Sequence, residues 1–255
     1  MSVSLIVLAA GKGTRMDSDL PKVLHRLGAA PLLYHALQAG QTLDPAQIVV
    51  VAGHGASLVE KSAHAFDAAI EVVHQAEQLG TGHAVAQAAP LLANAPGDVI
   101  VLYGDTPFVR TDTLQAMLDA RARHAVVVLG FEAADPGRYG RLVVDSDSLD
   151  RIVEFKDATD EERVITLCNS GVICADASLL FDLVALVGNE NASGEYYLTD
   201  IVALARAKGL SAGVVICDEA ETLGINTRAE LAAAEAAFQA RMRAEAMENG
   251  VTLAD

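Results

Sequence analysis

The chain has 255 residues, of which 52% are hydrophobic and 20% are charged, a composition that excludes a disordered protein. Its net charge of −16 argues against nucleic acid and against an anionic membrane surface as partners. Three cysteines without CxxC spacing indicate neither a disulfide framework nor a zinc site. No apolar run approaches the ~18 residues of a membrane span, and no charged segment precedes the first apolar run. We therefore expect a cytoplasmic protein without membrane insertion.

The first half of the chain alternates strand patterns with helix patterns. Continuous apolar runs rich in Val and Ile predict buried strands over residues 3–10, 47–53, 70–75, 98–104 and 125–131. Segments with helical periodicity predict helices over residues 31–43, 56–66, 81–95 and 111–123. This alternation predicts an α/β fold with a mostly parallel sheet.

After residue 135 the pattern changes. Residues 141–155 predict a hairpin closed around Asp145–Ser148. Further strands are predicted over residues 167–175 and 211–218, and helices over residues 178–187 and 196–208. Two pairs have the spacing of a helix capping box, Thr159 with Glu162 and Thr227 with Glu230. The second box opens an Ala-rich helix from about Arg228 to Glu248, so we expect one domain followed by a trailing helix.

The first strand runs directly into LAAGKGTRM, residues 8–16. Gly11 and Gly13 permit close backbone approach or a positive φ. The cations near them, which can neutralise phosphate, are Lys12, Arg15 and Lys22. A Walker A loop needs a different glycine spacing, and a dinucleotide fingerprint needs Gly or Ala where Met16 stands. The pattern fits either a separate kind of phosphate site or a solvated turn.

Three further segments each allow two interpretations. Asp105 follows a buried strand, where it could hold Mg²⁺ against substrate phosphates or form a turn that caps the next helix. Gly80 and Thr81 open a predicted helix and could bind a ligand there, or Thr81 could simply cap it. Asn226 is either a metal ligand or the turn residue before a cap. Glu154 and Asn169 could equally be surface or turn residues, and the seven histidines show no metal-ligand spacing.

Nine motifs nevertheless occur in order across residues 5–231: LAAGKGTRM, DLPKVLH, QAEQLGTGHA, LYGD, GRYGR, FKDATDEER, NSG, GEYYLTD and GINTRAEL. This series resembles the uridylyltransferase domain of the bacterial bifunctional enzymes that make UDP-N-acetylglucosamine. The first motif is shared by many sugar-1-phosphate nucleotidyltransferases, whereas QAEQLGTGHA, KDATDEER and GEYYLTD are specific to the N-acetylglucosamine branch. The resemblance implies a Rossmann-like, mostly parallel sheet of the sugar nucleotidyltransferase type with a C-terminal helix. It also implies transfer of uridylyl from UTP to N-acetylglucosamine 1-phosphate, a step in cell-envelope precursor synthesis.

The resemblance further implies a role for each matching residue. Backbone contacts to the nucleotide are implied for Leu8, Ala9, Ala10 and Gly11. Triphosphate binding and stabilisation of transition-state charge are implied for Arg15 and Lys22, and uracil recognition for Gln75, Gly80 and Thr81. Contacts to ribose and metal are implied for Tyr103, Gly104 and Asp105, with Asp105 and Asn226 as Mg²⁺ ligands. Binding of the amino sugar is implied for Gly140, Glu154 and Asn169.

The chemistry of this reaction agrees with the residue types present. The attacking phosphate oxygen is already an anion and needs no general base, so no His or Cys nucleophile is required. Alternatives at this point are a nucleotidyltransferase for another sugar 1-phosphate and a non-catalytic sugar-nucleotide sensor. A dehydrogenase is a weaker alternative, because no acidic residue ends the 47–53 strand.

The family's full-length enzymes continue into a β-helix that carries an acetyltransferase and forms trimers. The hexapeptide repeats of such a β-helix do not occur in this sequence. We therefore expect a uridylyltransferase domain over residues 1–227 and a linker helix with a tail over residues 228–255. For this chain we expect a monomer without acetyltransferase activity.

Overall fold

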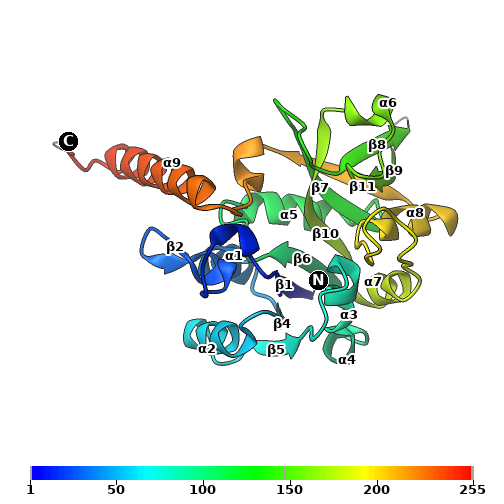
Figure 1. Ribbon diagram of the computed structural model, residues 1–255, viewed down its shortest axis with the longest axis horizontal. Coiled ribbons are helices and arrows are strands. Elements are labelled where there is room, and N and C mark those ends of the chain that lie inside the picture. The colour runs from blue at the N-terminus through cyan, green and yellow to red at the C-terminus, as the bar shows by residue number, and fades with distance from the viewer. Residues whose placement is uncertain (1, 146–147, 254–255) are drawn as a thin grey trace.

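The computed structural model describes residues 2–145 and 148–253, and a twisted mixed sheet forms its centre (Figure 1). The main path of the sheet follows the order β11-β7-β10-β6-β1-β4-β5, with the hairpin β8–β9 attached to β10. The strands of this path are β1 (Val3–Ala9), β4 (Gln47–Ala52), β5 (Glu71–His74), β6 (Asp98–Tyr103), β7 (Val126–Glu132), β10 (Leu167–Asp176) and β11 (Ala212–Cys217). The attached hairpin consists of β8 (Arg141–Asp145) and β9 (Ser148–Val153), and a separate small hairpin of β2 (Arg26–Leu27) and β3 (Ala30–Pro31).

Strands β5, β4, β1 and β6 are mutually parallel, as are β7 and β11, which confirms the mostly parallel sheet. On the main path the antiparallel strand is β10, which lies between β6 and β7, and the attached hairpin β8–β9 is antiparallel as well. Leu8 pairs with Val51 of β4 on one side and with Tyr103 of β6 on the other. The carboxyl ends of these three strands therefore lie at the same level, next to the point where the strand order reverses.

Two apolar layers cover the sheet because consecutive residues of each buried strand point to opposite faces. In β1, Ile6 packs into one buried cluster and Leu5 into the other. The helices are α1 (Leu32–Gln41), α2 (Ala56–Phe66), α3 (Thr81–Ala86), α4 (Ala89–Leu92), α5 (Thr111–Ala120), α6 (Asp160–Arg163), α7 (Ala177–Val184), α8 (Asp200–Ala207) and α9 (Arg228–Glu248). Three 3₁₀ helices, η1 (Thr14–Met16), η2 (Lys22–Leu24) and η3 (Glu219–Thr222), complete the described segments.

Most predicted elements agree with the structure to within a few residues, but the helix expected over residues 81–95 is wrong. The chain forms α3 and α4 instead, with a break at Gln87 and Ala88. Pro90 explains the break, because proline has no N–H to donate within a helix and clashes with the preceding turn. It is accepted in the first turn of α4, where that N–H is not needed.

The helix expected over residues 196–208 begins only at Asp200. Tyr196 uses its backbone in another way: its N–H donates to the carbonyl of Leu79, and its carbonyl accepts from the N–H of Gly82. This long-range pairing overrides the local helical pattern. Both capping boxes are confirmed, and the 141–155 hairpin closes with the pair Asp145 and Ser148, although its turn residues 146 and 147 lie outside the described residues.

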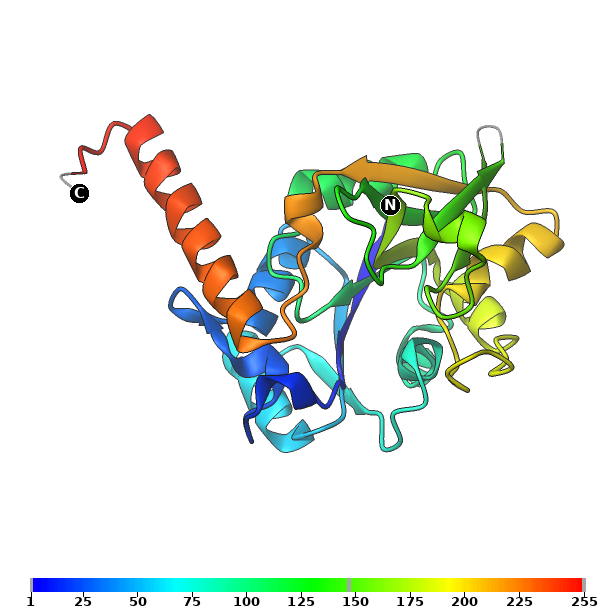
Figure 2. The same cartoon turned by 45° about the horizontal axis from the view of Figure 1, so that its top comes forward.

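The trailing helix α9 extends away from the sheet domain (Figures 1 and 2). Its first turns dock on the domain through Leu231, Ala234 and Phe238, which pack against a small cluster around Leu27. Glu235 accepts a 2.6 Å hydrogen bond from the backbone N–H of Gly28. Within residues 2–145 and 148–253, no helix has the length and apolar character that crossing a membrane requires.

Candidate active site

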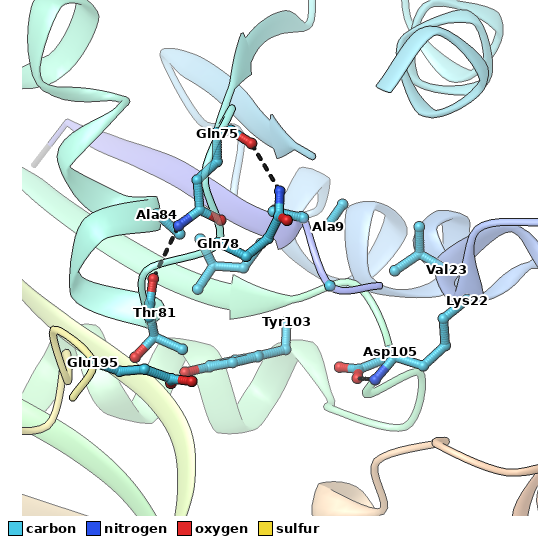
Figure 3. A pocket seen from close by; sticks show the side chains of 14 residues that line it. Ala9, Lys22, Val23, Gln75, Gln78, Thr81, Ala84, Tyr103, Asp105 and Glu195 are labelled. Atoms are coloured by element: carbon cyan, nitrogen blue, oxygen red, sulfur yellow. Dashed lines mark hydrogen bonds and ion pairs between the residues drawn. The ribbon is translucent and has the colours of Figure 1, made fainter. Parts of the chain in front are cut away.

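A cavity of about 280 Å³ opens at the carboxyl ends of β1 and β6 (Figure 3). It brings together ten of the residues singled out in the sequence: Leu8, Ala9, Ala10, Gly11, Lys22, Gln75, Gly80, Thr81, Tyr103 and Asp105. These residues come from segments separated by as many as 97 positions, Leu8 to Asp105, and they meet because the parallel strands end at one edge.

The glycine loop after β1 places Lys22. Gly13 has φ +59°, and a Cβ added to it would lie 2.7 Å from the Cβ of Lys22. Only glycine therefore allows this close approach. Gly11 lies in open space at the cavity wall, where its exposed backbone is accessible to a ligand. Arg15 lies in η1 on the exposed surface and does not line the cavity.

Lys22 joins the two predicted metal ligands. Its Nζ donates to the carboxylate of Asp105 and, over 2.9 Å, to Oδ1 of Asn226. The side chains of Lys22 and Asp105 are only 13% and 17% exposed. The backbone N–H of Ile225 donates to the carbonyl of Asp105 over 3.0 Å, which holds the end of β6 against the 224–226 turn. Glu230 of the α9 capping box accepts from the N–H of Asn226 over 2.6 Å, so α9 fixes this residue from the other side.

Gln75, Gly80 and Thr81 form the opposite end of the cavity. Nε2 of the buried Gln75 lies 3.1 Å from the carbonyl of Gly80, to which it donates, and 3.0 Å from Nδ1 of His83. Gly80 has φ +114°, and a Cβ there would lie 2.5 Å from the carbonyl oxygen of Tyr196. The hydroxyl of Thr81 accepts from the N–H of Leu198 over 3.0 Å and does not cap α3, so the interpretation of Thr81 as a plain cap is wrong.

Tyr103 lies in the cavity wall between the Gln75 end and the Lys22 end. Its ring packs on Gly171, which has φ +94° and where a Cβ would lie 2.6 Å from Cε2 of the ring. Burial raises the pKa of Tyr103, the carboxylates of Glu154 and Asp105 raise it further, and a hydrogen bond with Thr81 acts in the opposite direction. The hydroxyl is therefore protonated at neutral pH and can donate a hydrogen bond. Gly104 is buried behind this wall, and its N–H donates to the carbonyl of Leu8 over 2.9 Å.

Gly140, Glu154 and Asn169 come together beside this cavity without lining it. The N–H of Asn169 donates to the carbonyl of Gly140 over 2.8 Å. A Cβ added to Gly140 would lie 3.5 Å from Oε1 of Glu154 and 3.6 Å from the Cβ of Asn169. Burial raises the pKa of Glu154, which accepts from the hydroxyl of Thr199 over 3.2 Å. The carboxylates of Asp157, Asp200 and Glu195 add to that rise.

Four lining residues were not identified from the sequence: Val23, Gln78, Ala84 and Glu195. Gln78 and Glu195 lie within the motifs QAEQLGTGHA and GEYYLTD, which was the available signal. In the described parts of the chain, no group of three or more His, Cys, Asp or Glu side chains is arranged to hold a metal. Asp105 and Asn226 remain as a pair of oxygen donors with the chemistry to bind a hard cation.

Comparisons with known proteins identify relatives of this chain. The Bifunctional protein GlmU of Cereibacter sphaeroides strain ATCC 17025 is 77% identical over 252 residues, which is 99% of this chain and 56% of that protein. The protein of the same name from Roseobacter denitrificans is 63% identical over 253 residues, again 99% of this chain and 56% of the relative. The chain thus spans little more than half the length of these relatives.

A solved UDP-glucose pyrophosphorylase in complex with UDP-glucose superposes with a TM-score of 0.75 at 17% identity, covering 94% of this chain and all of that one. This likeness supports the sugar nucleotidyltransferase fold. The family described as MobA-like NTP transferase domain matches residues 5–192, a stretch that contains most of β1, the glycine loop and the ends of the strands around the cavity. The chain belongs to this family of NTP transferase domains.

Proposed function

We propose that the chain transfers uridylyl from UTP to N-acetylglucosamine 1-phosphate, giving UDP-N-acetylglucosamine and pyrophosphate. The observation that carries this proposal is the single cavity with Gln75, Gly80 and Thr81 at one end and Lys22 and Asp105 at the other. This placement suits a nucleotide whose base lies at the end with Gln75 and whose phosphates lie at the end with Lys22. High identity to proteins named GlmU supports the choice of substrates.

The base end suits uracil. Because Nε2 of Gln75 is engaged by Gly80 and His83, its Oε1 is the atom that can accept from a ligand. Uracil offers an N3–H donor at this edge and cytosine does not, so Gln75 would favour UTP over CTP. With cytosine, whose N3 carries no hydrogen, the buried amide oxygen of Gln75 would have no donor opposite it. Such an unpaired oxygen costs about 1–3 kcal/mol.

The phosphate end suits a divalent metal. Oxygen atoms of Asp105 and Asn226 already converge on one cation, the ammonium of Lys22, and carboxylate and amide oxygens are the ligands that Mg²⁺ accepts together with water and substrate phosphates. Mg²⁺ bound there would neutralise phosphate charge, in keeping with the divalent-metal dependence that the nucleotidyltransferase family implies. Lys22 and Arg15 would add positive charge opposite the leaving pyrophosphate.

The amino-sugar end is formed by Gly140, Glu154 and Asn169. The carboxylate of Glu154 and the amide of Asn169 can bind hydroxyl and acetamido groups of the sugar, while its phosphate is directed toward the nucleotide. The attacking phosphate oxygen is an anion, so the work of the protein is to orient the two substrates in line and to offset charge. No proton has to be removed by a side chain.

Pyrophosphate release with a panel of substrates tests this proposal. We expect turnover with UTP and N-acetylglucosamine 1-phosphate, much less with CTP or with glucose 1-phosphate, and none in excess EDTA. Equal turnover with glucose 1-phosphate would show that the chain serves another sugar 1-phosphate. Tight binding of UDP-N-acetylglucosamine without any turnover would indicate a sensor.

We also propose that residues 1–227 act as the catalytic domain, with residues 228–255 as a linker, and that the chain is a cytoplasmic monomer. The large apolar side chains that α9 exposes are Met242 and Met247, so this helix offers little apolar surface for an interface of the ~1,000 Å² that stable assembly needs. Light scattering at micromolar concentration should give the mass of a single chain. A trimer mass would contradict this assignment.

A further inference from the structure

The ammonium of Lys22 lies where a bound cation would be expected. It donates to the carboxylate of Asp105 and, over 2.9 Å, to Oδ1 of Asn226, the two oxygens proposed as metal ligands. A single positive charge thus satisfies both donors, and Figure 3 shows the Lys22 side chain extending to the carboxylate of Asp105. A metal ion and this ammonium cannot use the same pair of oxygens at once.

The base of the Lys22 side chain is fixed by packing, whereas its ammonium is held by the hydrogen bonds to Asp105 and Asn226. Gly13 packs so closely on the Cβ of Lys22 that any added side chain would clash at 2.7 Å, and η2 begins at Lys22 itself. Beyond the Cβ, the side chain is an unbranched stem that ends in a point charge with rotatable donors. Because Lys22 also lines the cavity, phosphates bound there would come within reach of the ammonium.

The main chain that carries the two oxygen donors is held by contacts that do not involve Lys22, and Nδ2 of Asn226 also donates to the carbonyl of Gly224 over 3.4 Å. The carbonyl of Asp105 accepts from Ile225, and the N–H of Asn226 donates to Glu230 of the α9 capping box. Movement of Lys22 would therefore leave Asp105 and Asn226 in place, as a pair of oxygens prepared for another cation.

We propose that Lys22 is a displaceable occupant of the cation position between Asp105 and Asn226, and that a divalent metal gains these ligands only when nucleotide phosphates draw the ammonium away. This inference rests on the proposed function, because it assigns a sequence of events to the same site. The consequence is that binding of the nucleotide strengthens binding of the metal. The free chain binds divalent metal weakly, since the ion must compete with a built-in positive charge.

Titration with Mn²⁺ alone, followed by the electron paramagnetic resonance of the free ion, tests the proposal. Lys22→Met removes the charge and keeps an unbranched side chain, and we expect it to bind Mn²⁺ about tenfold more tightly than the unaltered chain. Lys22→Arg retains a positive charge and should bind Mn²⁺ as weakly as the unaltered chain does. The matched control is Lys61→Met on the exposed surface of α2, which removes the same charge elsewhere and should change affinity by less than about twofold.

A second substitution locates the bound ion. Adding Asp105→Asn to Lys22→Met should abolish the gain in Mn²⁺ affinity. As an independent measurement, Mg²⁺ alone should raise the melting temperature of Lys22→Met and leave that of the unaltered chain nearly unchanged, since a ligand stabilises the state that binds it.

Equal or weaker Mn²⁺ binding by Lys22→Met would overturn the proposal, as would a gain that persists without Asp105. These titrations contain no UTP and no sugar phosphate. Their outcome is thus separate from the pyrophosphate assay, and failure of the displacement mechanism can be told apart from failure of the proposed reaction.

Discussion

The proposed nucleotide end and the proposed amino-sugar end of the site are built from different kinds of strand pairing. At the nucleotide end, the glycine loop and Asp105 follow the neighbouring parallel strands β1 and β6, which pair Leu8 with Tyr103. At the amino-sugar end, Glu154 directly follows β9 of the antiparallel β8–β9 hairpin, and Asn169 lies within β10, where it pairs antiparallel with Gly130 of β7. The pairing of β10 with β7 also shifts register between Asn169 and Ile173.

A site can thus be assembled from residues at the ends of parallel strands or from residues positioned by antiparallel pairing. Residues that follow parallel strands converge because the strand ends share an edge, and small changes of register leave them on that edge. Residues within antiparallel strands depend on register, since a slip of one residue turns each side chain to the other face. The charges differ as well: the nucleotide end presents Lys22, and the sugar end gathers Glu154 near the carboxylates of Asp157 and Glu195.

The largest effect is expected from Asp105→Ala at the nucleotide end. Removal of one contact that stabilises transition-state charge lowers kcat by about 10²–10³, and Lys22→Ala and Arg15→Ala should fall in this range. Asp105→Ala should be worse, because it removes a metal ligand and leaves Lys22 without its carboxylate partner. Steady-state pyrophosphate release measures the loss, with Asp112→Ala on the exposed surface of α5 as control. Near-normal kcat in all three site variants would place phosphate binding elsewhere.

The amino-sugar end should respond through KM rather than kcat. Glu154→Ala removes a charged acceptor, whose hydrogen bonds contribute about 1.5–3 kcal/mol, so KM for N-acetylglucosamine 1-phosphate should rise roughly 10- to 100-fold. KM for UTP should stay within about twofold. Initial rates with each substrate varied in turn separate these constants, and Glu161→Ala on exposed α6 is the control. A rise in KM for UTP of equal size would show that the two ends are not distinct.

Gly171→Ala tests the packing of the Tyr103 ring in the cavity wall. An alanine at φ +94° is strained by about 1–2 kcal/mol, and its methyl group would collide with the ring of Tyr103. We expect kcat/KM for both substrates to fall about tenfold and the melting temperature to fall by roughly 2–8 °C. Gly188→Ala, where an added Cβ meets nothing within 4 Å, should leave both quantities unchanged. Normal activity in Gly171→Ala would mean that the position of the Tyr103 ring is unimportant.

The two ends also differ in how far the sequence predicts them. The strand before Gly11 and the strand before Asp105 are continuous apolar runs, so their end positions and their common edge follow from local pattern. The meeting of Gly140, Glu154 and Asn169 depends on pairing between distant strands, and only the family resemblance indicated it. Residues 196–199 look helical locally, yet Tyr196 pairs with Leu79 and Gly82 because those backbone groups need partners. That pairing brings Glu195 to the cavity, which is why it was missed.

The smallest effect concerns the pH dependence of stability at the amino-sugar end. The pKa of Glu154 is raised by burial, so the folded chain holds this proton more tightly than the unfolded chain does. Stability is therefore lost as pH rises from the unfolded pKa through the folded pKa, and the loss persists above it. Glu154→Gln keeps the shape without the charge, and its melting temperature relative to the unaltered chain should improve by a few degrees between pH 4 and pH 8.

Glu162→Gln supplies a control of opposite sign. The backbone N–H of Thr159 holds the pKa of Glu162 below its usual range, so this carboxylate stabilises the fold above the unfolded pKa, and that contribution is lost as pH falls through the folded pKa. Its replacement should thus reduce the melting temperature more at pH 8 than at pH 4. Scanning calorimetry of both variants across this range gives the comparison. Parallel trends in the two variants would contradict the assignment of a buried, destabilising charge to Glu154, because a carboxylate with a raised pKa and one with a lowered pKa must change stability with pH in opposite directions.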